Sequence, residues 1–332
     1  MGVLSLAVVA FVVASALAQQ IPKPAGYPER GLTIIVCYGA GGGSDQMARA
    51  LEAPAERILG QPITVVNKPG GAGLACLPDF QATPADGYTI LQHTDGLVTQ
   101  YAAGKHNLSP LDDLIPLLTA NIVPSQLYVN PKDERFLVGG KADFDKVLAY
   151  AKANPRKLTV ANVSEPGGME SITMAVLERH FGIKTKQVSF DKPAERYASV
   201  VGGHLDVLLE QPGDVKALLE GKELLPVLTI WPKRFKAFPD VPATGKDYGL
   251  DWDPVLRWRA LYVKTGTPPE IVRYLETVFK AAWDSPGHQK FVVKKNLDII
   301  PSYRDSAATK KAIQGEIDTY TPIYKEMGLP TR

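Results

Sequence analysis

The sequence is poor in the residues that build metal centres and disulfide frameworks. Its 332 residues include two cysteines and five histidines. Two cysteines cannot form a disulfide scaffold, and the histidines form no His-x-x-x-His motif or cysteine–histidine cluster along the chain. We therefore expect no metal site and no fold held together mainly by disulfides.

Neither sign of charge dominates the composition. The chain has 37 basic and 35 acidic residues and a formal net charge of +2. Nucleic-acid-binding domains carry a strong basic excess, so this balance argues against a nucleic-acid partner. We also find no internal repeat and no low-complexity linker.

Long apolar runs are confined to the N-terminus. The first 18 residues carry no charge and end in Ala-Leu-Ala. This run is too short to span a membrane and fits an export signal, although the usual basic start is missing. We expect cleavage after Ala18, and the alternative is an N-terminal anchor. The remaining chain is longer than one hydrophobic core usually serves, which predicts two lobes.

Apolar strand-like runs alternate with helical patterns along most of the chain. A helical pattern at 144–154 lies between such runs, and the runs themselves cover residues 63–67, 88–92, 126–130, 157–163, 186–190, 205–210, 224–230 and 258–263. Alternation of this kind is typical of α/β proteins. The sequence therefore predicts an α/β fold with mainly parallel sheets flanked by helices.

A glycine-rich turn follows the first predicted strand, at residues 32–38. Residues 39–43 hold four glycines in five positions, and the helical pattern after them predicts a helix over residues 44–59 with Ser44 as its N-cap. Glycines let a ligand approach the backbone N–H groups at a helix start, which favours an anion. No lysine or arginine occurs at 39–45, or in a second turn at 70–73. Backbone N–H groups would therefore have to meet the anion.

Nucleotide binding fits this turn poorly. The dinucleotide fingerprint needs glycine or alanine where Ser44 stands, and an acidic residue where Asn67 ends the second predicted strand. No Gly-Lys-Ser/Thr follows the glycines, which also argues against a P-loop.

A serine acyltransferase is a remote alternative. Ser189 and Lys192 fit the S-x-x-K pattern, and residues 264–266 fit K-T-G. The serine should open a helix, yet Ser189 ends a strand-like run and Pro193 follows the lysine. We therefore expect no catalytic residues and no cofactor.

Seven sequence blocks are spread over residues 27–329: YPERGLTIIVCYGAGGGSDQMAR, LGQPITVVNKPGGAG, PADGYTIL, VVGGHLDVLLE, FPDVPATGKDYGL, KTGTPPEIV and IYKEMGL. These blocks and their order resemble Bug-type solute receptors of tripartite tricarboxylate transporters. The resemblance implies a periplasmic receptor of the Venus flytrap type, with one lobe at 27–126 plus 253–332 and the other at 127–252. It also implies a monomer that holds a small organic carboxylate and delivers it to membrane permease subunits. An orphan receptor that presents its ligand to a signalling partner is the alternative.

The resemblance also implies a ligand-binding set. It comprises both glycine turns and a helix start in the second lobe, together with positions that line that lobe: Ala40, Gly41, Gly42, Gly43, Ser44, Asp45, Gly70, Gly71, Ala72, Gly73, Gly167, Gly168, Ser171, Phe190, Glu210 and Arg259. The family often has His at 171, Tyr at 190 and Asp-Asn at 210–211. These departures leave the identity of the ligand open.

Several side chains in this set have two interpretations. Arg259 could bind a ligand carboxylate in a bidentate manner, or serve in hinge packing and a surface ion pair. Phe190 could be core or pocket floor. Glu210 could receive a ligand cation or hydroxyl, or cap a local turn.

The two cysteines flank the glycine turns. Cys37 precedes the first turn and Cys76 follows the second. If both turns converge on the cleft, a disulfide is possible in an oxidising compartment. Two buried free thiols are the alternative.

Overall fold

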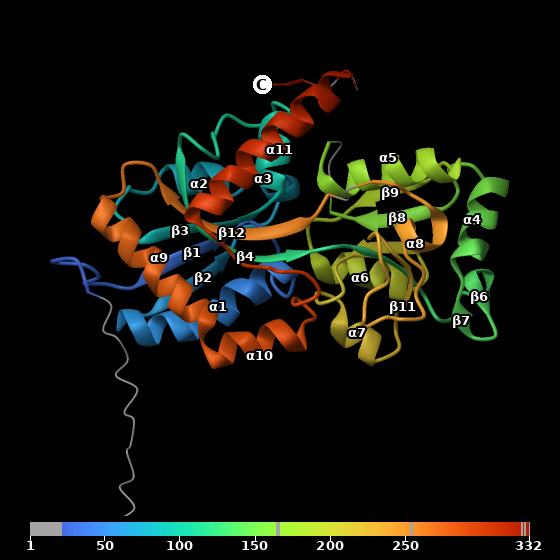
Figure 1. Cartoon of the computed structure of the whole chain (residues 1–332), viewed down its shortest axis with the longest axis horizontal. Helices are drawn as coiled ribbons and strands as arrows, with labels where there is room; N and C mark the ends of the chain where they lie inside the picture. The colour runs from blue at the N-terminus through green and yellow to red at the C-terminus, as the bar shows by residue number, and fades with distance from the viewer. Residues whose placement is uncertain (1–21, 164–166, 253–254, 327, 329, 332) are drawn as a thin grey trace, which may run out of the picture.

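A computed structural model describes residues 22–163, 167–252, 255–326, 328, 330 and 331. Two mixed sheets, each covered by helices, form the two lobes in Figure 1. The first sheet has the order β13-β4-β12-β3-β1-β2. Its strands are β1 (Leu32–Val36), β2 (Ile63–Asn67), β3 (Thr89–Thr94), β4 (Leu114–Val123), β12 (Arg257–Lys264) and β13 (Arg304–Asp305).

The second sheet has the order β11-β5-β10-β8-β9. Its strands are β5 (Gln126–Val129), β8 (Thr159–Asn162), β9 (Lys186–Ser189), β10 (Val207–Glu210) and β11 (Leu225–Thr229). A small hairpin of β6 (Leu137–Val138) and β7 (Lys141–Ala142) lies at the outer end of this lobe in Figure 1.

Helices flank both sheets (Figure 1). On the first sheet they are α1 (Gly43–Leu59), α2 (Leu77–Gln81), α3 (Gly96–Ala102), α9 (Pro269–Asp284), α10 (Pro286–Lys294) and α11 (Ser306–Glu326), with the 3₁₀ turn η1 (Gly71–Gly73). On the second they are α4 (Phe144–Ala153), α5 (Met169–Phe181), α6 (Pro193–Val201), α7 (Lys216–Glu220) and α8 (Thr244–Tyr248), with the 3₁₀ turn η2 (Glu134–Phe136).

The expected two-lobed α/β architecture is confirmed, but the sheets are mixed rather than mainly parallel. β1 pairs in parallel with β2 and β3, whereas β12 pairs antiparallel with β3 and β4. The direction reverses because the chain leaves the first lobe along β4 and returns along β12. These two strands lie side by side, and in Figure 1 they run between the first lobe and the second.

The apolar face predicted for the first helix is buried. Met47, Leu51, Ala55 and Leu59 of α1 are fully buried in the core cluster that also contains Phe279 of α9. A separate cluster fills the second lobe between its sheet and α4 and α5. Each lobe therefore has its own hydrophobic core.

The start of α1 differs from the expectation. The N-cap is Gly42, and Ser44 is the second helical residue, so Ser44 is not the cap. Asp45 stabilises the turn instead, because its Oδ2 accepts a hydrogen bond from the Gly41 N–H at 2.9 Å. A carboxylate inside the first helical turn thereby closes the glycine loop.

The hypothesis of a disulfide is confirmed. Cys37 and Cys76 are bonded, with Cα atoms 5.3 Å apart, and both side chains are fully buried. The bond ties the end of β1 to the segment after η1. Ligand atoms of both cysteines and of His93 lie within 4.8 Å of one another, a cluster that sequence spacing does not show. Metals bind thiolates, and both sulfur atoms are in the disulfide.

Among the described residues, no helix is both long enough and apolar enough to cross a membrane. The predicted export signal and its cleavage site after Ala18 lie outside the described residues.

Candidate functional site

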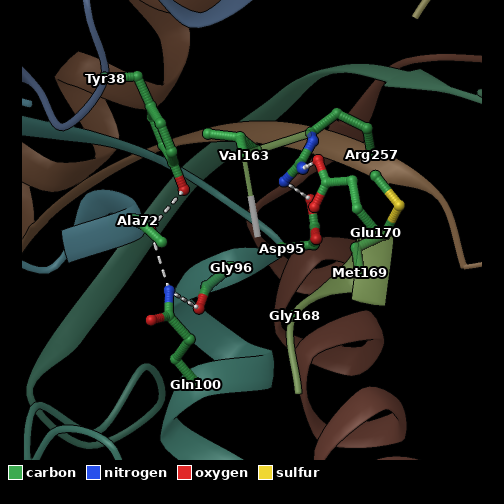
Figure 2. Close-up of a pocket in the computed structure, with 10 residues that line it drawn as sticks. All are labelled: Tyr38, Ala72, Asp95, Gly96, Gln100, Val163, Gly168, Met169, Glu170 and Arg257. Carbon is green, nitrogen blue, oxygen red and sulfur yellow. Dashed lines mark hydrogen bonds and ion pairs between the residues drawn. The ribbon is translucent and has the colours of Figure 1, made fainter. Parts of the chain in front are cut away.

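The junction of the two lobes contains two small adjoining cavities. Both are lined by Tyr38, Val163, Glu170 and Arg257, so they form two halves of one cleft. Figure 2 shows the half that lies between the second glycine turn and the start of α5.

Arg257 connects the lobes at the centre of this cleft. Its Nη1 donates to Asp95 Oδ1 at 2.7 Å, and its Nη2 donates to Glu170 of the opposite lobe. Figure 2 shows dashed lines from the guanidinium to both carboxylates. Burial raises the pKa of Asp95 to about 6, and the Arg257 charge opposes this rise. The cleft therefore contains an ionic network that is already largely paired within the protein.

The second glycine turn adopts left-handed backbone conformations. Positive φ angles occur at Gly70, Gly71, Ala72 and Gly73, and Ala72 is the exception to glycine in this run. A β-carbon on Gly73 would also approach the Tyr38 hydroxyl oxygen to 2.8 Å. Glycine is needed here for both backbone freedom and space.

Buried side chains of the first lobe fix the carbonyl groups of this turn. Gln100 Nε2 donates to the Ala72 carbonyl at 3.0 Å, and His93 Nε2 donates to the Gly73 carbonyl at 2.9 Å. Burial lowers the pKa of His93 to about 4, so the imidazole is neutral at pH 7. With its carbonyls held on the inner side, the turn presents its Ala72 N–H to the cleft, where it donates to Asp191 Oδ1 at 3.0 Å.

The first glycine turn lies directly against the second lobe. A β-carbon on Gly42 would lie 2.7 Å from Pro193 Cγ of α6, and one on Gly43 would lie 2.2 Å from Asp214 Oδ2 of the second lobe. Gly42 has φ −77°, so close approach of the lobes, not left-handed backbone, requires glycine there. Helix geometry leaves the first N–H groups of α1 without partners inside the helix, at this edge of the cleft.

Arg259 is buried in the cleft, so its interpretation as part of a surface ion pair is wrong. Its Nη2 donates to the Asp214 carboxylate of the second lobe and also to Gln211 Oε1, at 3.3 Å. Burial raises the pKa of Asp214 against the opposing effect of the Arg259 charge. This pair joins the lobes, as Arg257 and Glu170 do.

Glu210 is already paired inside the second lobe. It accepts hydrogen bonds from Arg196 and from the Tyr197 hydroxyl, the latter at 3.1 Å. Burial would raise the pKa of Glu210, but the charge and hydrogen bond of Arg196 lower it below its ordinary value. Its backbone neighbour, the Gln211 N–H, also donates to it at 3.1 Å, so the carboxylate closes a local turn and holds an arginine.

The structure brings together only part of the predicted ligand-binding set. The residues that line the cleft are Gly42, Gly43, Ser44, Ala72, Gly168, Glu210 and Arg259. Residues adjacent to these within the two turns and the start of α5 are Ala40, Gly41, Asp45, Gly70, Gly71, Gly73 and Gly167. The Asp45 carboxylate accepts hydrogen bonds from the Gly41 N–H and from Arg49 Nε.

Two predicted residues lie apart from the lining. Ser171 is a half-buried residue in the first turn of α5. Phe190 packs against the cluster around Tyr128 and Val200, which supports its interpretation as core.

Sequence reasoning missed most of the charged lining. Asp95, Glu170, Asp191, Arg196 and Asp214 all reach the cleft. A signal existed for Asp95, because it directly follows β3 and ligand sites of α/β sheets gather at the carboxyl ends of strands. No comparable local pattern marks the others.

The acyltransferase pattern is not assembled. Ser189 ends β9, and Lys192 Nζ binds Glu195 at 2.9 Å. Lys264 Nζ binds the carbonyl groups of Gln81 and Thr83, both at 2.7 Å, on the first lobe.

Comparison with known proteins gives matches over most of the chain. The family described as "Tripartite tricarboxylate transporter family receptor" matches residues 47–329. A Cupriavidus necator protein named "UPF0065 protein in gbd 5'region" is 30% identical over 306 residues, which cover 91% of this chain and 89% of that protein.

Two solved structures from Rhodopseudomonas palustris share the fold. MatC with bound malate has a TM-score of 0.77 at 21% identity and covers 90% of this chain and 99% of that chain. A structure with adipate has a TM-score of 0.80 at 23% identity, and the match covers 92% of this chain and 99% of that chain. At these identities the likeness establishes the two-lobed architecture.

Proposed function

The chain belongs to the tripartite tricarboxylate transporter receptor family, and we propose that it captures a small organic carboxylate between its lobes and delivers it to the membrane permease subunits of such a transporter. The observation that carries the proposal is the position of the two glycine turns. The start of α1 and the Ala72 N–H face the same cleft from the first lobe. Related structures hold malate and adipate, which are both dicarboxylates.

Backbone donors and arginines together supply the affinity in this proposal. A micromolar Kd corresponds to about −8 kcal/mol, whereas a helix terminus contributes about 0.3–1 kcal/mol. The helix start alone is therefore insufficient. Arg257 and Arg259 line the cleft beside the turns and can reinforce the recognition of an anion.

The work of such a receptor is differential binding to open and closed conformations, not catalysis. We propose residues 27–126 and 253–332 as one lobe and 127–252 as the other, supported by the division of the strands between two sheets. We propose the seven cleft-lining residues of the predicted set, with the neighbouring turn residues, as the ligand contacts. We further propose that the protein acts as a monomer.

The export proposal concerns the N-terminus. Receptors of this family act in the periplasm, and we propose cleavage after Ala18, supported by the uncharged run before it. Intact-mass spectrometry of protein from the periplasmic fraction tests the cleavage. A chain that retains residues 1–18 in the membrane fraction would support the anchor alternative.

A thermal-shift screen with a library of mono-, di- and tricarboxylates and amino acids tests ligand binding. A ligand at about 100 times its Kd adds about 2.7 kcal/mol of stability, which for a chain of this length corresponds to a rise in Tm of about 4 °C. Hits are confirmed by calorimetry. If no carboxylate raises Tm in protein that is folded by circular dichroism, the proposal is wrong.

Delivery to a permease is tested separately in the host. Deletion of the gene should abolish uptake of the labelled ligand, and re-expression should restore it. Normal uptake combined with an altered transcriptional response would favour the signalling alternative.

A further inference from the structure

The second lobe places a carboxylate of its own on the second glycine turn. Asp191 lies in the short segment between β9 and α6, and its Oδ1 accepts the Ala72 N–H hydrogen bond across the cleft. The adjacent Lys192 pairs with Glu195. Asp191 is therefore bound to the turn by a backbone donor.

This contact differs from the other carboxylate contacts between the lobes. Glu170 and Asp214 bind Arg257 and Arg259, and their side chains are 3% and 6% exposed. Asp191 is exposed, and its partner is a neutral amide. Of the three, Asp191 is the carboxylate that leaves its donor at the smallest cost, because charged hydrogen-bond partners and burial hold the other two.

We propose that Asp191 is an affinity-determining residue, whose carboxylate competes with the ligand carboxylate for the Ala72 N–H. This inference rests on the proposed function, in which the glycine turns receive the ligand anion. One N–H group carries one proton, and two carboxylates at the same donor repel each other. A ligand that takes this donor must first displace Asp191.

The competition lowers the apparent affinity. Only the fraction of molecules in which Asp191 has left the turn can bind a ligand at this donor, and the apparent Kd rises by the inverse of that fraction. Removing the Asp191 carboxylate should therefore tighten binding. A residue that merely assists closure of the lobes would have the opposite effect, so the sign of the change is diagnostic.

The test compares the wild-type protein with Asp191→Ala, Asp191→Asn and the control Glu195→Ala. Glu195 is an exposed carboxylate in the first turn of α6, four residues after Asp191, and it binds an exposed lysine. Calorimetric titrations with malate and with adipate should show about two- to tenfold tighter binding to Asp191→Ala, which corresponds to one ordinary hydrogen bond. Asp191→Asn should show a smaller gain, because its amide oxygen can still accept the Ala72 N–H although the charge is gone. Glu195→Ala should bind like the wild type.

A second measurement needs no ligand. Hydrogen–deuterium exchange at the Ala72 amide should be faster in Asp191→Ala than in the wild type and in Glu195→Ala, because the acceptor is lost. Equal exchange in the three proteins would overturn the contact on which the inference depends.

The outcomes separate this inference from the proposed function. Unchanged or weaker binding of either acid to Asp191→Ala would overturn the competition and leave the carboxylate receptor intact. If neither acid nor any carboxylate of the library binds any of the four folded proteins, the anion site itself is refuted, and the competition with it.

Discussion

Arg257 of β12 and Glu170 of α5 form an ion pair that joins the two lobes. Their side chains are 5% and 3% exposed, and the same guanidinium binds Asp95 of its own lobe. A buried charge that loses its partner is strongly destabilising. The arginine therefore couples the position of α5 to the first lobe.

Glu170→Gln should lower the pKa of Asp95 below about 6. The charge of Glu170 contributes to the raised pKa, so its removal favours ionised Asp95 beside Arg257. Carboxyl carbon chemical shifts followed by NMR against pH give this value. In the wild type, the raised pKa costs stability as pH rises from 3.8 to about 6, and this loss should be smaller in the variant. A pKa that stays the same or rises would contradict the coupling.

Gly42→Val should weaken carboxylate binding at least about tenfold, or about 1.4 kcal/mol, without unfolding the protein. The new side chain would collide with Pro193 across the cleft, while the φ of −77° imposes no left-handed strain. Calorimetry measures binding, and circular dichroism measures folding. Gly287→Val is the matched control, because a β-carbon on Gly287 meets open space at the start of α10. Wild-type affinity in a folded Gly42→Val protein would exclude this turn from the site.

The Cys37–Cys76 disulfide determines how many reactive thiols the protein contains before and after reduction. Denatured, unreduced protein should contain no reactive thiol, and reduction should release two. Since the bond closes a loop with a sequence separation of 39 residues, the double variant Cys37→Ala/Cys76→Ala should lose about 4 kcal/mol of unfolding free energy. Labelling with a thiol reagent and chemical denaturation measure the two quantities. Two thiols before reduction would contradict the bond in the isolated protein.

Neutral His93 should make stability fall in acid. Its pKa drops from 6.5 to about 4 on folding, so the unfolded chain binds the extra proton between these values. The unfolding free energy should decrease by about 3 kcal/mol as pH falls from 6.5 to 4. The difference in unfolding free energy between the wild type and His93→Gln, measured at each pH, cancels the contributions of the other titrating groups. The glutamine retains a donor for the Gly73 carbonyl and does not titrate. A pH-independent difference would refute the assignment.

Local patterns were sufficient for the elements that frame the site. The spacing of Met47, Leu51, Ala55 and Leu59 predicts α1, and the structure buries that face with the start of the helix shifted by one residue. The glycine turns were recognisable because a turn without side chains is a local property. The cap was misassigned, because Ser44 is a suitable N-cap residue by type, but the path of the loop makes Gly42 the N-cap and leaves the Asp45 carboxylate to bind the Gly41 N–H.

The sequence by itself determined the two-lobed α/β class, the glycine turns and the family, because all three depend on order and periodicity along the chain. The tertiary structure decided the charged lining of the cleft. Arg257 pairs with Glu170 87 residues away, and the Ala72 N–H meets Asp191 119 residues away. Contacts between such distant residues arise only when the lobes approach, so no local spacing encodes them.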